Sequence, residues 1–176
     1  MTVLNSAPAA AATVSPLRVT PASPLFLRED EIRRGIELLY FGYTSMIRGA
    51  DAILEAQGLG RAHHRSLYFI ARRPGLSVGE LIGLLGITKQ SLGRVLNDLL
   101  GRELIVQAIG TSDRRQRLLS LTTAGAALEA RLFIELERSM ARAYGEAGQQ
   151  AVTGFWGVLM GLVPPDGREA IEALQG

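Results

Sequence analysis

The chain has 176 residues, of which 47% are apolar and 20% charged, a composition typical of one globular domain with a sizeable core. Its mean hydropathy of +0.17 is high, yet its richest apolar stretch, residues 155–163, is far shorter than the ~20 residues of a membrane-spanning helix. We therefore expect no membrane partner, and we expect a second subunit to cover part of the apolar surface. The absence of cysteine excludes disulfides, thiolate metal ligands and cysteine nucleophiles.

Charge is distributed unevenly along the chain, although the net charge is only +2. Residues 61–117 hold ten basic and four acidic side chains, a local excess of +6, whereas the remainder has nine basic and thirteen acidic side chains. A basic middle between acidic ends indicates a module that binds a polyanion.

Residues 1–27 are rich in Ala, Pro, Ser and Thr and show no periodicity. A secretory signal is the competing interpretation, but no basic region precedes the apolar residues, which Asn5, Ser6 and Pro8 interrupt. We expect a disordered N-terminal arm.

Residues 28–60 contain the first periodic segment. Apolar residues recur at alternating spacings of four and three from Ile32 to Ile53, by way of Ile36, Leu39, Tyr43, Met46 and Ala50. This heptad seam predicts one long helix over residues 29–57 that packs against other helices. We interpret it as a dimerisation helix.

Residues 61–122 show the alternation of short elements expected of a winged helix-turn-helix. Helices are predicted over residues 62–72, from the capping box Ser77–Glu80 to Gly86, and from Thr88 to about Gly101. Two short strands, residues 104–106 and 118–121, enclose a polar hairpin tip. Two further helices, residues 124–144 and 149–162, follow within the predicted C-terminal dimerisation segment, residues 123–176.

The helix after Thr88 carries the side chains best suited to read DNA. Opposite its apolar stripe of Leu92 and Leu99 lie Gln90, Arg94 and Asn97, flanked by Thr88, Lys89 and Ser91. Arginine can bind guanine through two hydrogen bonds, and Gln or Asn can bind adenine in the same way. An ordinary solvated helix face is the alternative, which the basic hairpin nearby disfavours.

The hairpin tip carries Arg114, Arg115 and Arg117, which can reach phosphates or a narrow minor groove. We interpret Asp113 as an ion-pair brace that orients one of these arginines. Asp113-Arg114-Arg115, followed by Leu121-Thr122-Thr123-Ala124-Gly125, resembles the wing and next helix of the MarR family of bacterial transcription regulators. The resemblance covers residues 29–162. Glu103 departs from it, since the family often has glycine there.

The resemblance implies a mainly α fold with a small β-hairpin wing and a helical dimerisation body. It also implies a homodimer that regulates transcription, binds double-stranded DNA at a pseudo-palindromic operator and acts in the bacterial cytoplasm, on the nucleoid. The wing arginine, Arg115 above all, would enter the minor groove. No enzyme motif is found: the sequence has no nucleophile elbow, phosphate loop or metal-binding helix. A winged-helix module that binds a protein instead of DNA is the alternative.

The two histidines, His63 and His64, border the apolar face of their helix. Structural hydrogen bonding is the simpler interpretation. The functional alternative is a pocket for a small aromatic or anionic effector, because the family's effectors typically bind between dimer body and DNA-binding lobe. Its candidate residues are Tyr40, Tyr43, His63, His64, Arg65 and Tyr68. Haem is a further alternative for this pocket, the sequence identifies no cofactor, and two adjacent histidines alone do not predict a metal site.

Overall fold

The computed structural model describes residues 23–110 and 113–175, so the predicted arm, residues 1–27, lies largely outside the described residues. The chain divides into two compact units, residues 1–40 and 41–176. At the end of the predicted arm, Pro24–Leu27 form a 3-10 helix, η1. It forms because the Ser23 hydroxyl accepts a hydrogen bond from the Leu25 N–H and proline suits a first helical turn.

The single helix predicted over residues 29–57 is wrong in one respect, because it is interrupted at Ile47. Helix α1 spans Glu29–Met46, and α2 spans Arg48–Glu55. The interruption separates two environments. No residue of α1 is buried, whereas a Cβ on Gly49 of α2 would lie 2.5 Å from Oε2 of Glu135, so α2 lies directly against α6. The segment after Ile47 is therefore placed by packing rather than by the heptad pattern.

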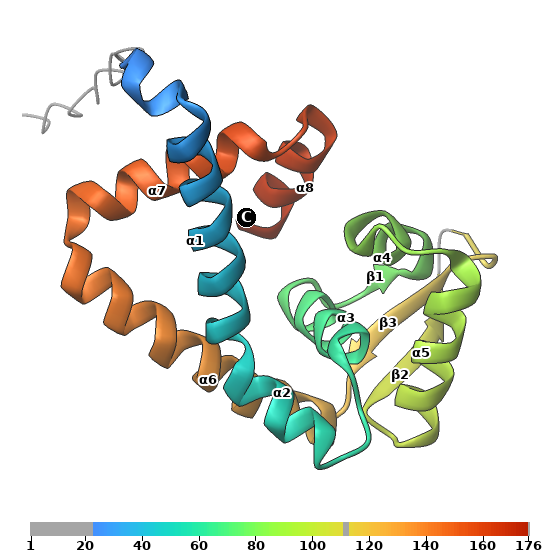
Figure 1. The fold of residues 1–176 in the computed structure, drawn as a ribbon. Helices are drawn as coiled ribbons and strands as arrows, with labels where there is room; N and C mark the ends of the chain where they lie inside the picture. The colour runs from blue at the N-terminus through green and yellow to red at the C-terminus, as the bar shows by residue number, and fades with distance from the viewer. Residues whose placement is uncertain (1–22, 111–112, 176) are drawn as a thin grey trace, which may run out of the picture. The chain divides into compact units, whose positions relative to one another are not determined.

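A lobe of short helices and a small antiparallel sheet follows in the second unit (Figure 1). Its helices are α3 (Arg61–Arg72), α4 (Val78–Leu85) and α5 (Lys89–Gly101), and its strands are β1 (Leu76–Ser77), β2 (Ile105–Ile109) and β3 (Arg117–Leu121). The strand order is β1-β3-β2. Strand β1 was not predicted, because two residues are too few to show a period. It forms because Leu76 pairs with Leu119.

The predicted caps of the turn motif are confirmed. The Ser77 hydroxyl accepts from the Glu80 N–H (3.2 Å), and the Glu80 carboxylate accepts from the Ser77 N–H (2.8 Å). Gly86 ends α4 with a φ of +61°, a left-handed conformation that lets the chain turn sharply into α5. The turn between α4 and α5 thus lies between Gly86, the C-cap of α4, and Thr88, the N-cap of α5, as in a helix-turn-helix.

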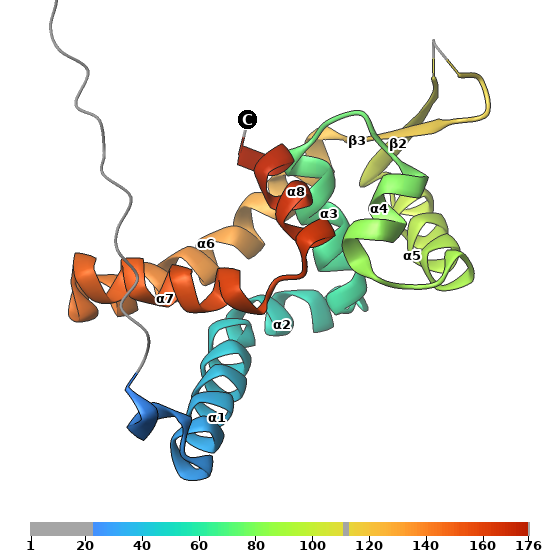
Figure 2. The ribbon, with the colours of Figure 1, turned by 90° about the horizontal axis from the view of Figure 1, so that it is seen from above.

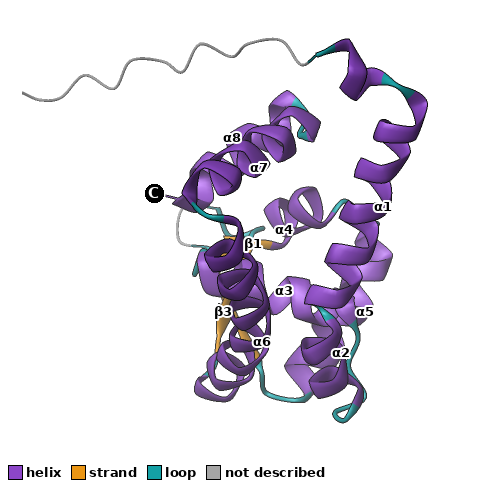
Figure 3. Ribbon diagram, turned by 60° about the vertical axis from the view of Figure 1, so that its left-hand side comes forward, coloured by secondary structure: helices purple, strands orange, loops and turns teal. Residues whose placement is uncertain are grey.

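The core of the second unit is built from aliphatic side chains of α2, α3, the turn motif, the sheet and α6. Its fully buried members include Leu67, Ile70, Leu81, Leu92, Leu99, Leu119 and Leu132. Figure 3 shows how little strand there is beside the helices that supply these residues. The predicted fold, mainly α with a small β wing, is confirmed.

Three helices close the chain. They are α6 (Thr123–Ala147), α7 (Gln149–Leu162) and α8 (Pro165–Gln175), of which α8 was not predicted. The Arg72 guanidinium of α3 donates to the Leu174 carbonyl of α8. No helix within the described residues is long and apolar enough to cross a membrane.

Candidate nucleic-acid interface

Helix α5 presents a polar face to solvent, as the sequence predicts. Leu92 and Leu99 are fully buried on one side of the helix. The opposite face carries the exposed side chains of Gln90, Arg94 and Asn97, and Lys89, also exposed, flanks this face in the first turn of the helix. None of these four side chains forms a hydrogen bond or ion pair with another residue of the described segments. Their donors and acceptors are therefore available to an external partner.

Thr88 and Ser91, also predicted to contact DNA, form the N-terminal cap of α5. The Thr88 hydroxyl accepts from the Ser91 N–H (3.2 Å) and lies 3.0 Å from the Ser91 hydroxyl. Both residues are exposed. They stabilise the first turn of the helix and so place the side chains that follow.

The wing extends beyond α4 and α5, as Figure 2 shows. Strands β2 and β3 pair in register from Ile105 opposite Leu121 to Ile109 opposite Arg117. The tip between them belongs to the basic part of the sequence, and its residues 113–117 are all exposed.

The predicted ion pair between Asp113 and a wing arginine is wrong, because the Asp113 carboxylate binds a backbone N–H group instead. The Asp113 carboxylate accepts a hydrogen bond from the backbone N–H of Arg115 (2.9 Å) and forms no ion pair with an arginine of the described chain. The Gln116 N–H donates to the Asp113 carbonyl (3.0 Å). Asp113 is thus the first residue of a tight turn, where a short carboxylate hydrogen-bonds the backbone two residues on.

Two of the three wing arginines have no hydrogen-bond or ion-pair partner within the described segments. Arg117 donates to the Arg114 carbonyl (3.3 Å), but the guanidinium groups of Arg114 and Arg115 bind no residue of the described segments. Gly110 is needed at the base of the tip, because a Cβ there would lie 2.6 Å from the Asp113 carbonyl oxygen.

A tight junction connects α5 to the wing and to α6. Among the described residues, Glu103 is the non-glycine residue with a positive φ, 56°. The Glu103 N–H donates to the Leu100 carbonyl (3.0 Å), and the Leu104 N–H donates to the Leu99 carbonyl (2.9 Å). This is the Schellman pattern of a helix end, in which glycine usually occupies the position of Glu103.

The start of α6 closes the same junction. The Thr122 hydroxyl donates to the Glu103 carbonyl (2.7 Å). A Cβ on Gly125 would lie only 1.8 Å from the Leu104 carbonyl oxygen. The backbones of α6 and of the segment before β2 therefore touch without room for a side chain.

The six residues predicted for an effector pocket are divided between the two compact units. Tyr40 belongs to the first unit, and Tyr43, His63, His64, Arg65 and Tyr68 belong to the second. Two surface hollows of about 720 and 280 Å³ are lined by none of these six residues. The described segments contain no cluster of three or more His, Cys, Asp or Glu residues that could hold a metal ion. The effector pocket stays a prediction.

The two histidines have different surroundings. His64 is buried, and burial lowers its pKa, an effect that the carboxylate of Asp51 only partly offsets. His63 uses both ring nitrogens: Nδ1 accepts from the Gly60 N–H (3.0 Å), and Nε2 lies 3.1 Å from Oδ2 of Asp98. The structural interpretation therefore fits His63 directly.

Sequence reasoning missed Asp98 and its partner Arg102. Arg102 donates to Asp98 Oδ1 (2.7 Å), and this hydrogen bond is the main reason that the pKa of Asp98 is lowered. An acidic residue four positions before an arginine is a readable helix signal. The contact between Asp98 and His63 has no such signal, because the two residues are far apart in the sequence.

Comparison with known proteins agrees with this architecture. Residues 57–116 match the model of the MarR family. The HTH-type transcriptional regulator PetP of Rhodobacter capsulatus is 44% identical over 151 residues, which is 86% of this chain and 91% of PetP.

Solved structures show the same fold. A crystal structure of a MarR family transcription regulator has a TM-score of 0.66 at 15% identity, covering 80% of this chain and 93% of its own. A mutant of MarR from E. coli in complex with operator DNA has a TM-score of 0.61 at 21% identity, covering 81% and 100%. These structures show the fold, and the 44% identity to PetP together with the family-model match identifies the chain as a member of the MarR family of transcription regulators, which are not enzymes.

Proposed function

We propose that this regulator binds double-stranded DNA in a sequence-specific way, with α5 in the major groove and the wing tip at the minor groove. The observation that carries the proposal is the exposed face of Gln90, Arg94 and Asn97 with the flanking Lys89, whose side chains form no hydrogen bond or ion pair within the described segments. A helix face with unused bidentate donors and acceptors suits the edges of base pairs. The unpaired guanidinium groups of the wing suit phosphates.

We further propose that the protein acts as a homodimer, in the bacterial cytoplasm and on the nucleoid. Neither α1 nor α7 contains a buried residue, although both are rich in large apolar side chains. Ile36 is 63% exposed, Trp156 56% and Val158 68%. Such surfaces are stable in water when a second copy covers them. Two-fold symmetry then implies a pseudo-palindromic operator with half-sites about 10 base pairs apart, or a multiple of that distance.

The dimer is tested by sedimentation of two matched variants. Val158→Asp on α7 should shift the protein toward monomer, because a carboxylate would be buried in the interface. Val106→Asp, at a 51% exposed valine of the wing strand β2, should leave the dimer intact. A wild-type protein that is monomeric at micromolar concentration would contradict the proposal.

DNA reading is tested by selection of bound sequences from a random library, followed by titration of Arg94→Ala. The variant should lose about 1–3 kcal/mol of discrimination at the base pair that Arg94 reads. Arg131→Ala, at an exposed arginine of α6, is the control and should keep the wild-type preference. Equal weakening on all sequences would make Arg94 a phosphate contact. A wild type that selects no sequence would favour the protein-binding module instead.

We also propose that a small aromatic or anionic effector changes the affinity for DNA. A ligand can act only through different affinities for the competent and incompetent dimers, and a coupling of about 1–3 kcal/mol would change DNA affinity about 5–150-fold. A thermal-shift screen of aromatic acids, followed by DNA titration with each hit, tests this idea. Hits that leave DNA affinity unchanged would count against it.

A further inference from the structure

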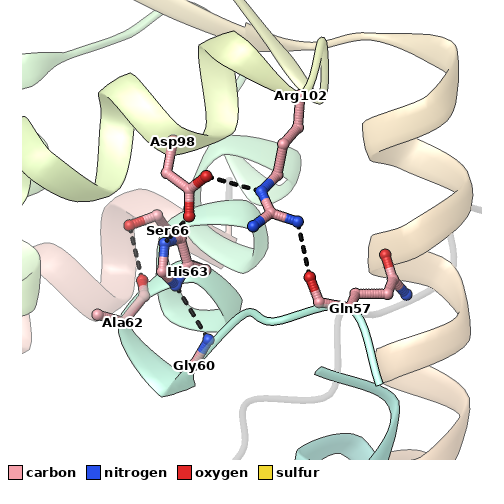
Figure 4. Close-up of polar contacts among 7 residues, drawn as sticks. All are labelled: Gln57, Gly60, Ala62, His63, Ser66, Asp98 and Arg102. Atoms are coloured by element: carbon pink, nitrogen blue, oxygen red, sulfur yellow. Dashed lines mark hydrogen bonds and ion pairs between the residues drawn. The ribbon is translucent and has the colours of Figure 1, made fainter. Parts of the chain in front are cut away.

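A continuous set of polar contacts joins the end of α5 to the loop that follows α2 (Figure 4). Asp98 is held by Arg102 at one carboxylate oxygen and by His63 at the other. Arg102 also donates from Nη1 to the Gln57 carbonyl (2.6 Å), and His63 accepts from the Gly60 N–H. We call these five residues the polar bridge. It reaches the α2–α3 loop by two separate routes.

The contacts define the protonation of the His63 ring. A neutral imidazole has one acceptor nitrogen and one donor nitrogen. Because Nδ1 accepts from Gly60, the hydrogen is on Nε2, which donates to Asp98. The side chains of His63 and Asp98 are 17% and 38% exposed, so the contact is partly shielded from solvent. Both hydrogen-bonding capacities of the ring are used inside the chain.

The polar bridge supplies what apolar packing cannot. Helix α5 packs on α3 and on the sheet through Leu92, Val95, Leu96 and Leu99. Burial of apolar surface holds helices together but has little directional preference. Hydrogen bonds require particular distances and angles. The polar bridge therefore fixes how the C-terminal end of α5 is placed relative to the loop after α2.

We propose that His63 is a positioning residue for the recognition helix, acting through Asp98. In the homodimer of the proposed function, on which this inference rests, the placement of α5 relative to α2 sets the distance between the two recognition helices. His63 then determines how strictly the protein requires one spacing between DNA half-sites. His63 would thus increase the discrimination between half-site spacings without contacting DNA itself.

Two substitutions separate the two contacts of the ring. In His63→Asn the amide oxygen lies where Nδ1 was, so the variant keeps an acceptor for the Gly60 N–H but is too short to reach Asp98. In His63→Gln the amide nitrogen takes the place of Nε2, so the variant keeps a donor for Asp98 and loses the acceptor for Gly60. The pair therefore tests the Asp98 contact separately from the cap of α3.

The experiment compares wild type and both variants on the selected operator and on operators with one base pair added or removed between half-sites. His63→Asn should lose about three- to tenfold of the discrimination between spacings, as expected for one hydrogen bond. His63→Gln should retain it. Urea unfolding of each variant confirms that the proteins compared are folded.

The outcomes distinguish this inference from the proposed function. The role of His63 would be overturned if both variants lost spacing discrimination equally, if only His63→Gln lost it, or if His63→Asn retained it in full. Each of these outcomes would leave the proposal of DNA binding intact. A wild type that selects no operator would refute the proposed function and the role of His63 with it.

Discussion

The conformation of Glu103 makes a prediction about stability that can be worked from the backbone. Its φ of 56° lies in the left-handed region at the C-terminal end of α5. The two hydrogen bonds of the Schellman pattern and the bond from the Thr122 hydroxyl hold it there. Glu103→Gly should keep all three, because each uses only backbone atoms of residue 103 or of its neighbour Leu104.

The size of the effect is a difference of two terms. Left-handed geometry costs an L-residue about 1–2 kcal/mol, which glycine avoids. Glycine loses about 0.5–1 kcal/mol more backbone entropy on folding. With the middle of each range, Glu103→Gly should raise the free energy of unfolding by about 0.7 kcal/mol. For a chain of this size, that corresponds to an increase in Tm of about 1–4 °C.

Denaturation at a fixed protein concentration measures this gain, since the stability of the proposed dimer would depend on concentration. Glu103→Ala is the matched control, because it removes the same exposed carboxylate and leaves a Cβ at a positive φ. It should not stabilise the protein. If alanine stabilised as much as glycine, the charge and not the backbone would be the cause, and the reasoning would be refuted.

Three further predictions concern other described residues. Gly125→Ala should destabilise the chain by more than about 1 kcal/mol in urea unfolding, because the added Cβ would meet the Leu104 carbonyl at 1.8 Å; wild-type stability would show that the junction can open. The lowered pKa of His64 means that the unfolded chain protonates first, so its contribution to stability is complete above the unfolded pKa of about 6.5 and is lost as pH falls through the folded pKa. His64→Gln should reduce the slope of unfolding free energy between about pH 5 and 7, and an unchanged slope would exclude His64. Asp113→Ala should weaken DNA binding without changing unfolding, whereas Asp113→Asn, which keeps an acceptor for the Arg115 N–H, should bind normally; equal weakening would indicate a role for the charge.

The elements that the sequence predicts well are those whose causes lie within a few residues. Ser77 and Glu80 satisfy each other's N–H groups three positions apart, and Gly86 supplies the left-handed turn. The exposed face of α5 follows from helical periodicity alone. Local chemistry is sufficient in these places, so the turn motif and the exposed polar face of α5 could be located from the sequence.

Contacts between distant segments could not be predicted in this way. The partner of His63 is Asp98 on another helix, and no local sequence pattern links the two residues. Asp113 was expected to bind a guanidinium, but the turn brings the Arg115 backbone amide closer. The interruption at Ile47 depends on how closely α2 lies against α6. In each case the local sequence allows more than one contact or helix boundary, and tertiary packing determines which one forms.

Helix α5 is held by two connections, one formed by backbone contacts and the other by side-chain hydrogen bonds. Toward the wing, the junction at Glu103, Leu104 and Gly125 is backbone against backbone, with no space for a side chain. Toward the α2–α3 loop, the polar bridge of His63 and Asp98 uses partly exposed side chains, which solvent can replace. Because that junction includes Gly125, helix α5, the wing and the first turn of α6 should move together as one body, while the polar bridge to the α2–α3 loop is the softer connection. In the proposed homodimer, a change in the separation of the two recognition helices would most easily arise there, without disturbing the surface that is proposed to meet DNA.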